Sequence, residues 1–182
     1  MATLESLRRH ASLEIIGGII VTYYSTVESP IGQLLLTSNG ENLTGIHMEK
    51  SAHAAEIQPA WQENSSLQVF RKTAQQLSEY FEGNRTDFDL PLSMDGTAFQ
   101  KLVWRELQKI PYGETTSYKD LAIRIGNPKA CRAVGLANGR NPISLVVPCH
   151  RVIGANGKLV GYGGGLDRKA QLLELERSVL DA

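Results

Sequence analysis

The chain changes character near residue 95, and this change constrains its fold more than any other feature. Short β-prone runs separated by turn residues fill the first half, whereas apolar residues at helical spacing dominate the second. Strands followed by helices predict an α+β fold, and 182 residues are enough for two small domains. We predict an N-terminal extension over residues 1–20, an N-terminal α/β domain over 21–92 and a C-terminal domain over 97–182, with Pro91 in the linker.

Three strands and one helix are predicted in the N-terminal domain. The strands cover residues 21–27, 33–37 and 43–48, with turns at 29–32 and 39–42, and they indicate an antiparallel meander. The helix covers residues 65–81, because its apolar residues recur at spacings of three and four. Ser65 and Gln68 predict a capping box at its start, and Gly83 its end. The extension before the first strand is expected to be frayed or helical.

The C-terminal domain is predicted to be mainly helical. Thr97 and Gln100 indicate a capping box for a helix that stops before Pro111, with Trp104 in the core. The elements expected near the end of the chain are a buried strand at residues 143–147, a hairpin at residues 156–157 and a helix over residues 167–180.

Residues 117–138 have the pattern of a helix-turn-helix. Ser117 is expected to cap a short helix that ends at Gly126. Asn127 is expected to cap the next helix, with Pro128 at its first position. Two short helices joined by a tight glycine turn are typical of DNA-binding proteins.

A cysteine beside a histidine, Cys149-His150, directly follows the predicted buried strand. Nucleophilic thiol chemistry needs a thiolate, and a thiolate at neutral pH needs a nearby base or cation. The dipeptide alone leaves a second interpretation open, because a free cysteine is often a small core residue.

Charge is divided unevenly between the two halves. Residues 1–95 hold 6 basic and 12 acidic side chains, a net charge of −6, and residues 96–182 hold 13 and 7, a net charge of +6. This asymmetry favours phosphate binding by the second half, although two oppositely charged halves can also simply attract each other.

Cysteine and histidine usage bears on compartment and metals. Two cysteines, Cys131 and Cys149, do not make a disulfide scaffold, and a free thiol suits a reducing cytoplasm. No cysteine lies near His10, His47 or His53, so we expect no metal site. No run approaches the ~18 apolar residues of a membrane span.

Three motifs occur in the order and spacing of one known family: Arg-Ala-Val-Gly at 132–135, Pro-Cys-His-Arg-Val at 148–152 and Gly-Tyr-Gly-Gly-Gly at 161–165. Through them the chain resembles the O6-alkylguanine-DNA alkyltransferases (methylated-DNA–protein-cysteine methyltransferases). The resemblance is close over residues 97–176, holds in outline over 23–92 and is absent before that. It implies a ribonuclease H-like antiparallel sheet with a helix, followed by a winged-helix-like domain that contains the helix-turn-helix.

The resemblance also implies catalytic roles. Cys149 would be the nucleophile, His150 its base, directly or through a water, and Glu176 would orient the imidazole. Asn141 would tie this triad to the recognition helix, and Tyr118 would donate a proton to the departing purine. From the residues alone, Glu176 could equally be a solvated helix residue, Asn141 a turn former before a proline, and Tyr118 a half-buried aromatic.

The substrate pocket is expected to include Val152, Tyr162, Gly163 and Ser144. Two of these depart from the human-type family pattern. Gly163 lacks a hydroxyl that could bond the substrate O6, so its backbone N–H would do so. Ser144 stands where the family has Pro, which removes an apolar wall and leaves the size of the alkyl group open.

The second short helix is the expected DNA contact. Arg132 is a single long side chain among Ala130, Cys131, Ala133 and Gly135, and small residues let a helix approach DNA closely. Arg132 would fill the space of a flipped base, and the family places this helix in the minor groove. A surface arginine is the plainer alternative. The phosphate contacts are expected from Thr116, Ser117, Lys129 and Arg151.

The function that the resemblance implies is repair of O6-alkylguanine, and of O4-alkylthymine, by irreversible transfer of one alkyl group to Cys149. We expect no cofactor, a monomer, a cytoplasmic location, double-stranded DNA as partner and no membrane. Three alternatives remain. A non-catalytic lesion-binding protein is disfavoured by Cys149, and a helix-turn-helix regulator by a second helix poor in side chains that read bases. A Cys-His hydrolase is disfavoured only by the DNA-binding half.

Overall fold

The N-terminal domain is built on a four-stranded sheet in the order β5-β4-β3-β6. The computed structural model describes residues 15–16, 19–51 and 54–181. Strands β3 (Tyr23–Val27), β4 (Leu34–Ser38) and β5 (Leu43–Met48) pair antiparallel, so the predicted meander is confirmed. The two-residue strand β6 (Gln62–Glu63) adds parallel to β3 and was not predicted.

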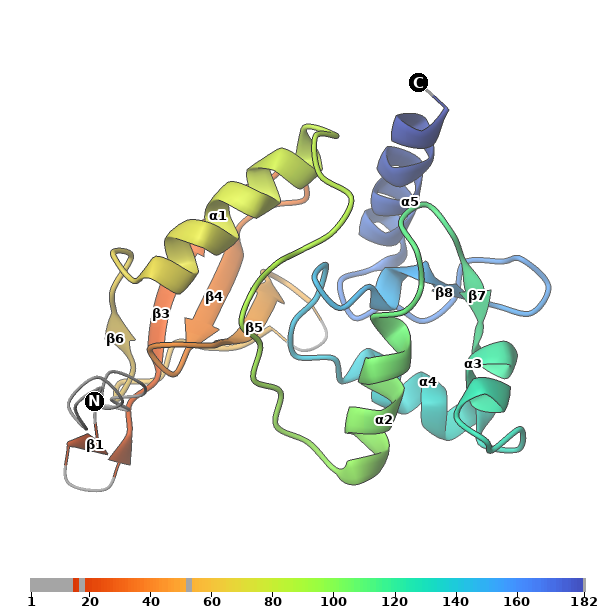
Figure 1. Cartoon of the computed structure of the whole chain (residues 1–182), viewed down its shortest axis with the longest axis horizontal. Helices are drawn as coiled ribbons and strands as arrows, with labels where there is room; N and C mark the ends of the chain where they lie inside the picture. The colour runs from red at the N-terminus through yellow and green to blue at the C-terminus, as the bar shows by residue number, and fades with distance from the viewer. Residues whose placement is uncertain (1–14, 17–18, 52–53, 182) are drawn as a thin grey trace, which may run out of the picture.

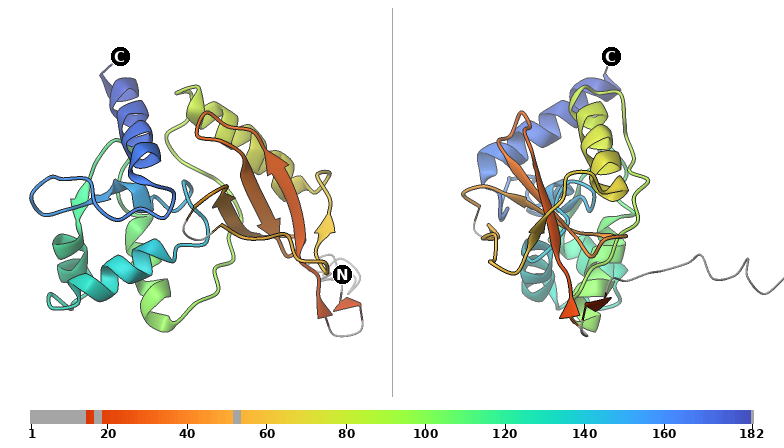
Figure 2. Two further views of the ribbon diagram at one scale, coloured as in Figure 1. Left: turned by 180° about the vertical axis from the view of Figure 1, so that it is seen from behind. Right: turned by 90° about the vertical axis from the view of Figure 1, so that its left-hand side faces the viewer.

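Helix α1 (Gln68–Phe81) covers one face of this sheet (Figures 1 and 2). Its side chains Phe70, Leu77 and Tyr80 are buried, as are Leu34 and Leu36 on the facing strand. The predicted helix is therefore confirmed, but its capping box is wrong. The residue before the helix is Leu67, which has no side-chain cap, because the chain turns at residues 64–67 before the helix begins. Gly83 follows α1 with a φ of 77°, as the helix end requires.

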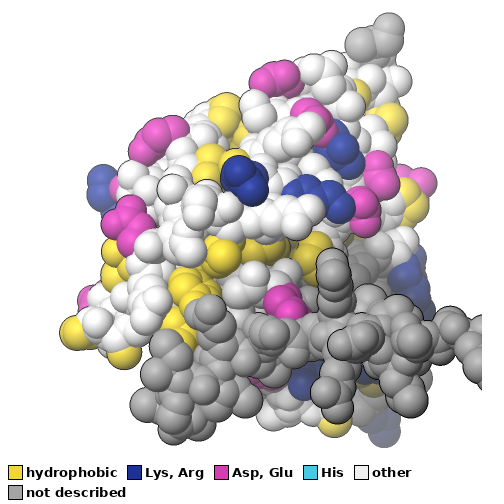
Figure 3. Space-filling model, turned by 60° about the vertical axis from the view of Figure 1, so that its left-hand side comes forward, with side chains coloured by type: hydrophobic (Ala, Val, Ile, Leu, Met, Phe, Trp, Pro, Cys, Tyr) yellow, Lys and Arg dark blue, Asp and Glu magenta, His cyan; other side chains and the backbone are white. Residues whose placement is uncertain are grey.

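The extension before the sheet is described only in part. Strands β1 (Ile15–Ile16) and β2 (Ile19–Ile20) form an antiparallel pair, so these residues are neither frayed nor helical, which corrects our expectation. The rest of the predicted extension lies outside the described residues. Among the residues coloured in Figure 3, which views the molecule from the side of the N-terminal domain, acidic and basic side chains are interspersed.

The C-terminal domain is mainly helical, as predicted. Its first helix, α2 (Ala98–Leu107), starts with the predicted capping box, in which the Thr97 and Gln100 side chains each bond the other's backbone N–H. Trp104 on α2 is 1% exposed, which confirms its place in the core, and its indole nitrogen donates to the Ala137 carbonyl. The last helix is α5 (Leu166–Leu180), also close to the prediction.

Helices α3 (Tyr118–Arg124) and α4 (Cys131–Gly139) form the helix-turn-helix and lie side by side in Figures 1 and 2. The Ser117 hydroxyl accepts from the Asp120 N–H and caps α3 as predicted. The predicted start of α4 at Asn127 is wrong. The Ala130 N–H donates to the Asn127 carbonyl at 3.0 Å, which closes a separate turn, and α4 begins only at Cys131. Proline fits the second position of such a turn as well as the start of a helix.

The apolar run at residues 143–147 is a buried loop and not the predicted strand. Ile143, Leu145 and Val147 are buried, but Leu145 has a φ of 73°, which breaks extended pairing. The hydrophobic pattern of residues 143–147 thus predicted their burial correctly and their secondary structure incorrectly. The 3-10 helix η1 (Cys149–Arg151) follows this loop.

The turn of the predicted hairpin at residues 156–157 is present, although no strand follows it among the described residues. The Gly157 N–H donates to the Gly154 carbonyl, and the Gly154 N–H donates to the Lys158 carbonyl, both at 2.9 Å. Strand β8 (Val152–Ile153) pairs instead in parallel with β7 (Thr116–Ser117), which begins the helix-turn-helix. This pairing fixes the residues after η1 against the start of α3.

The two domains share one hydrophobic core and several direct bonds. The Ile46 N–H on β5 donates to the Pro142 carbonyl at 2.9 Å. The Arg168 guanidinium on α5 donates to the carbonyls of Ile31 and Glu49 at 2.7 and 2.9 Å. Residues just before Cys149 are therefore held against the edge of the N-terminal sheet.

Candidate active site

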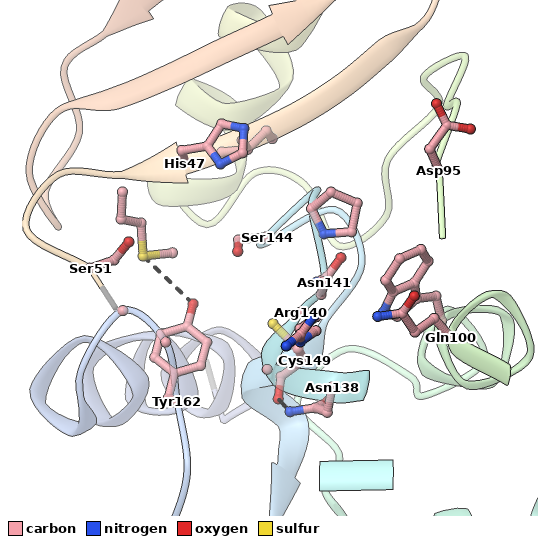
Figure 4. Close-up of a pocket in the computed structure, with 17 residues that line it drawn as sticks. His47, Ser51, Asp95, Gln100, Asn138, Arg140, Asn141, Ser144, Cys149 and Tyr162 are labelled. Atoms are coloured by element: carbon pink, nitrogen blue, oxygen red, sulfur yellow. Dashed lines mark hydrogen bonds between the residues drawn. The ribbon is translucent and has the colours of Figure 1, made fainter. Parts of the chain in front are cut away.

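Cys149 opens into a cavity of about 530 Å³ that both domains line. The N-terminal domain contributes residues of β5, and the C-terminal domain contributes Trp104, the end of α4 and the loop after it. Figure 4 shows the Cys149 sulfur directed into this cavity between Tyr162 and Asn141. The predicted pocket residues Ser144, Tyr162 and Gly163 also line it.

One predicted pocket residue does not reach the cavity. Val152 is fully buried in β8 and is absent from the cavity wall, so a direct substrate contact by its side chain is not supported. Sequence reasoning did not single out His47, which lines the cavity. It is only half-buried, but it lies on the strand that borders the cavity.

The Cys149 thiol is held in a protonated state. Its residue is 4% exposed, and burial raises the pKa of the thiol, which the Asn141 side chain and the Lys169 ammonium only partly offset. A buried thiol of this kind is a poor nucleophile until a neighbouring group removes its proton. The chemistry therefore depends on a base.

His150 is a suitable base. It is fully buried, and burial lowers its pKa, so the imidazole is neutral near pH 7. Its Nε2 lies 2.8 Å from Glu176 Oε1. Since an ionised carboxylate can only accept, Nε2 carries the proton and Nδ1 is a bare acceptor. Nδ1 is buried and has no hydrogen-bond partner among the described residues, so it is free to take a proton.

Glu176 is the centre of a buried hydrogen-bond network. Five donors converge on its carboxylate: His150 Nε2, Arg151 Nε, the second Arg151 nitrogen (NH2), the Tyr80 hydroxyl and the Gly113 backbone N–H, at 2.8–3.0 Å. Burial alone would raise the pKa of Glu176, but the hydrogen bonds from His150 and Arg151, together with the Arg151 charge, lower it to about 2. The carboxylate is therefore ionised and orients the imidazole, and the interpretation of Glu176 as a solvated helix residue is wrong.

The Arg151 side chain is not available for the phosphate contact that we predicted. It is buried, its Nε and second terminal nitrogen bond Glu176, and its first terminal nitrogen donates to the Ile110 carbonyl at 2.7 Å. All three guanidinium nitrogens of Arg151 thus have hydrogen-bond partners inside the protein. The adjacent histidine and arginine serve one carboxylate, because the tight turn of η1 presents both to α5.

The other predicted phosphate contacts differ in exposure. Lys129 is exposed, and Ser117 is half-buried with its hydroxyl engaged by Asp120. Thr116 is only 6% exposed, so its side chain is not available on the surface.

Asn141 closes the loop before Cys149. Its amide nitrogen donates to the Val147 carbonyl at 2.7 Å, and its amide oxygen accepts from the Ile143 N–H at 3.1 Å. Asn138, on the last turn of α4, donates to the Cys149 carbonyl at 3.4 Å and was not predicted. Asn138 at the end of α4 and Asn141 just after it therefore bond both ends of the loop that leads to Cys149. These bonds are compatible with both roles that we considered for Asn141, a turn former before Pro142 and a link to α4.

Tyr118 and Lys169 are two further titratable residues that interact with Cys149. The Tyr118 hydroxyl donates to the Gly161 carbonyl at 2.9 Å, and burial, followed by the charge of Cys149, raises its pKa to about 12. Lys169 is fully buried, and its ammonium bonds the carbonyls of Val152 and Val160. Burial lowers the pKa of Lys169 to about 8. Sequence reasoning missed Lys169, although its spacing of seven from Glu176 places both on one face of α5.

The outer face of α4 is exposed and carries few large side chains. Arg132 and Ala133 are exposed at its start, and Leu136 is 70% exposed. Ala130, Cys131 and Gly135 are half-buried, and a Cβ on Gly135 would lie 3.7 Å from the Tyr118 ring. The small residues thus let α4 sit close to Tyr118 while Arg132 points to solvent.

The described residues contain no group of three or more His, Cys, Asp or Glu side chains that could hold a metal ion. None of the helices described is both long and apolar enough to cross a membrane.

A buried cysteine with a neutral histidine and an ionised glutamate, placed beside a helix-turn-helix, defines a class of protein that performs thiol chemistry next to a DNA-binding motif. Residues 22–94 match the family described as "6-O-methylguanine DNA methyltransferase, ribonuclease-like domain", and residues 98–178 match its "DNA binding domain". The chain belongs to the 6-O-methylguanine DNA methyltransferase family.

Individual relatives agree with this. A methylated-DNA–protein-cysteine methyltransferase of Methanosarcina acetivorans is 53% identical over 86% of this chain and 99% of its own length. The protein of the same description from Mycolicibacterium paratuberculosis is 54% identical over 85% and 92%. The crystal structure of Mycobacterium tuberculosis OGT in complex with DNA is 50% identical, covers 86% of this chain and 94% of its own, and superposes with a TM-score of 0.80. The α+β fold predicted from the sequence is confirmed.

Proposed function

We propose that this chain is a methylated-DNA–protein-cysteine methyltransferase that repairs O6-alkylguanine, and O4-alkylthymine, in double-stranded DNA. Family membership and relatives of the same description support the activity. The single observation that carries the mechanism is the Cys149 sulfur in an open cavity, adjacent in sequence to a neutral histidine whose Nδ1 has no partner among the described residues.

The transfer is an in-line displacement at the alkyl carbon. The thiol proton of Cys149 passes to His150 Nδ1, directly or through a water, while the sulfur forms a bond to the alkyl carbon and the carbon–O6 bond breaks. Glu176 stabilises the imidazolium that results. The electron pair of the broken bond stays on the purine, which takes a proton from the Tyr118 hydroxyl, and the histidine proton restores the phenol. The products are S-alkylcysteine and guanine, and each protein molecule acts once.

The substrate base must leave the helix to reach this cavity. Extrusion of a base from a duplex costs a few kcal/mol, and a side chain that fills the vacated space offsets part of this cost. Arg132 is exposed on the face of α4 that carries small residues, which suits insertion from the minor groove. We propose that the protein binds DNA there as a monomer and acts in the cytoplasm.

A pair of cysteine variants tests the proposal. Single-turnover transfer from a duplex with O6-methylguanine should be abolished in Cys149→Ala, which should still bind the duplex, and should stay within about twofold of wild type in Cys131→Ala. The amount of lesion repaired should equal the amount of wild-type protein. Transfer by Cys149→Ala would refute the mechanism. Binding without transfer by the wild type would favour the lesion-binding alternative.

A further inference from the structure

A tyrosine of the N-terminal domain reaches the catalytic carboxylate of the C-terminal domain. Tyr80 lies in the last turn of α1, and its hydroxyl donates to Glu176 Oε1 at 2.8 Å. Both side chains are 0% exposed. The other four donors to this carboxylate come from residues after position 110, so Tyr80 is the N-terminal domain's contribution to the network.

The Tyr80 hydroxyl can act only as a donor here. Burial, and next the charge of Glu176, raise the pKa of Tyr80 well above its usual value, so the phenol stays protonated. The ring is also fixed in place by Phe88 and Tyr112, with ring centroids 5.5 and 5.9 Å away. The hydroxyl is therefore aimed at the carboxylate by packing and does not rely on the hydrogen bond for its position.

Tyr80 shares an acceptor atom with the catalytic histidine. Glu176 Oε1 accepts from Tyr80, from His150 Nε2 and from the second terminal nitrogen of Arg151, whereas Oε2 accepts from Arg151 Nε and the Gly113 N–H. Donors on one oxygen compete for its electron density, so each weakens the pull of the oxygen on the others. Tyr80 thus reduces the basicity that Glu176 presents to His150.

We infer that Tyr80 is a positioning residue for the Glu176–His150 pair, so that the N-terminal domain completes an active site whose reacting groups all belong to the C-terminal domain. The inference rests on the proposed function in one respect, the role of His150 as the base. It predicts that the strength of this base is set partly by a residue in a different domain.

The direction of the effect follows from the charges around the pair. His150 faces Glu176, Arg151 and, at longer range, the Lys169 ammonium, and Glu176 faces Tyr80 and Tyr112 from the other side. Loss of the Tyr80 hydroxyl leaves more negative charge on Oε1, which favours the protonated imidazole and raises the pKa of His150. A base with a raised pKa is lost at a higher pH, so the acid limb of the transfer rate moves upward.

The test compares two matched variants of the full chain. Tyr80→Phe removes the hydroxyl that bonds Glu176 and keeps the ring. Tyr112→Phe removes a hydroxyl from the same cluster that is buried but has no hydrogen-bond partner among the described residues. Single-turnover rates should be measured from pH 5 to 9 with an O6-methylguanine duplex, and the His150 ring should be titrated by NMR in each protein without DNA.

For Tyr80→Phe we expect the acid limb and the His150 titration to move up together by roughly one pH unit, the effect of one charge-assisted hydrogen bond. The rate should fall about tenfold on the acid limb and less than about threefold at pH 8 to 9. Tyr112→Phe should show neither shift. A rate loss equal at every pH, or the same shift in both variants, would overturn the inference while leaving the proposed function intact.

The NMR titration separates the two claims. If the wild type does not transfer alkyl groups, the proposed function fails, but the pKa of His150 can still be compared between the variants. An unchanged His150 titration in Tyr80→Phe overturns the coupling whatever the activity.

Discussion

Replacing Glu176 by Gln should destabilise the folded chain by about 3–5 kcal/mol, because it leaves the buried Arg151 guanidinium without its counter-charge. The amide also places an NH2 group where a carboxylate oxygen had accepted, so donors of the network would face another donor. The pKa of Glu176 indicates a similar magnitude. It is about 2 in the folded chain and 4.5 for an ordinary glutamate, which corresponds to about 3 kcal/mol in favour of the ionised form in the folded state.

Urea unfolding at pH 7 measures this loss. With a slope of about 2 kcal/mol/M, the midpoint should fall by roughly 2 M. Glu174→Gln is the matched control, because Glu174 is exposed on the same helix, and it should stay within about 0.5 kcal/mol of wild type. A loss below about 1 kcal/mol in Glu176→Gln would refute the interpretation of the network as a buried, charge-compensated cluster. Transfer by this variant should be measured where it is still folded, and there it should be slow.

Three further outcomes are expected. Because the folded pKa of Glu176 lies below its unfolded value, its stabilising contribution is present above pH 4.5 and is lost toward pH 2, so the stability difference between wild type and Glu176→Gln should shrink over that range; a constant difference would contradict the linkage. Arg132→Ala should slow repair of duplex O6-methylguanine by about tenfold or more and of the free base by less than about threefold, whereas equal losses would exclude insertion into the stack. DNA affinity should fall steeply with salt and vary little with sequence, and removal of the exposed Lys129 should reduce the salt slope by about one unit; a flat salt dependence would count against phosphate binding.

Elements with a strong local signal were predictable from the sequence. The capping box at Thr97, the cap at Ser117 and the apolar spacing of α1 and α5 each fix a helix through contacts within a few residues. The meander was predictable because turn residues separate its three strands. Strands of two residues, such as β7 and β8, carry no such signal, because only the tertiary pairing defines them.

The errors came from residues whose surroundings are set by distant parts of the chain. A basic residue beside a DNA-binding motif suggests a phosphate contact, but Arg151 turns inward because Glu176, 25 residues later, accepts it. The loop at residues 143–147 is apolar because it is covered by the N-terminal sheet, and Leu145 adopts a φ that no pattern indicates. Tyr80 had no local feature that distinguished it from the other aromatic residues of α1.

The central claim is that Cys149 accepts the alkyl group, and peptide mapping by mass spectrometry tests it most directly. After incubation with an O6-methylguanine duplex, the intact protein should gain the mass of one methylene group and no more. Trypsin cleaves after Arg132, Arg140 and Arg151, so Cys131 and Cys149 fall in different peptides. The whole gain should lie on the peptide of residues 141–151. An unmodified Cys149 peptide, or a gain carried by Cys131, would contradict it.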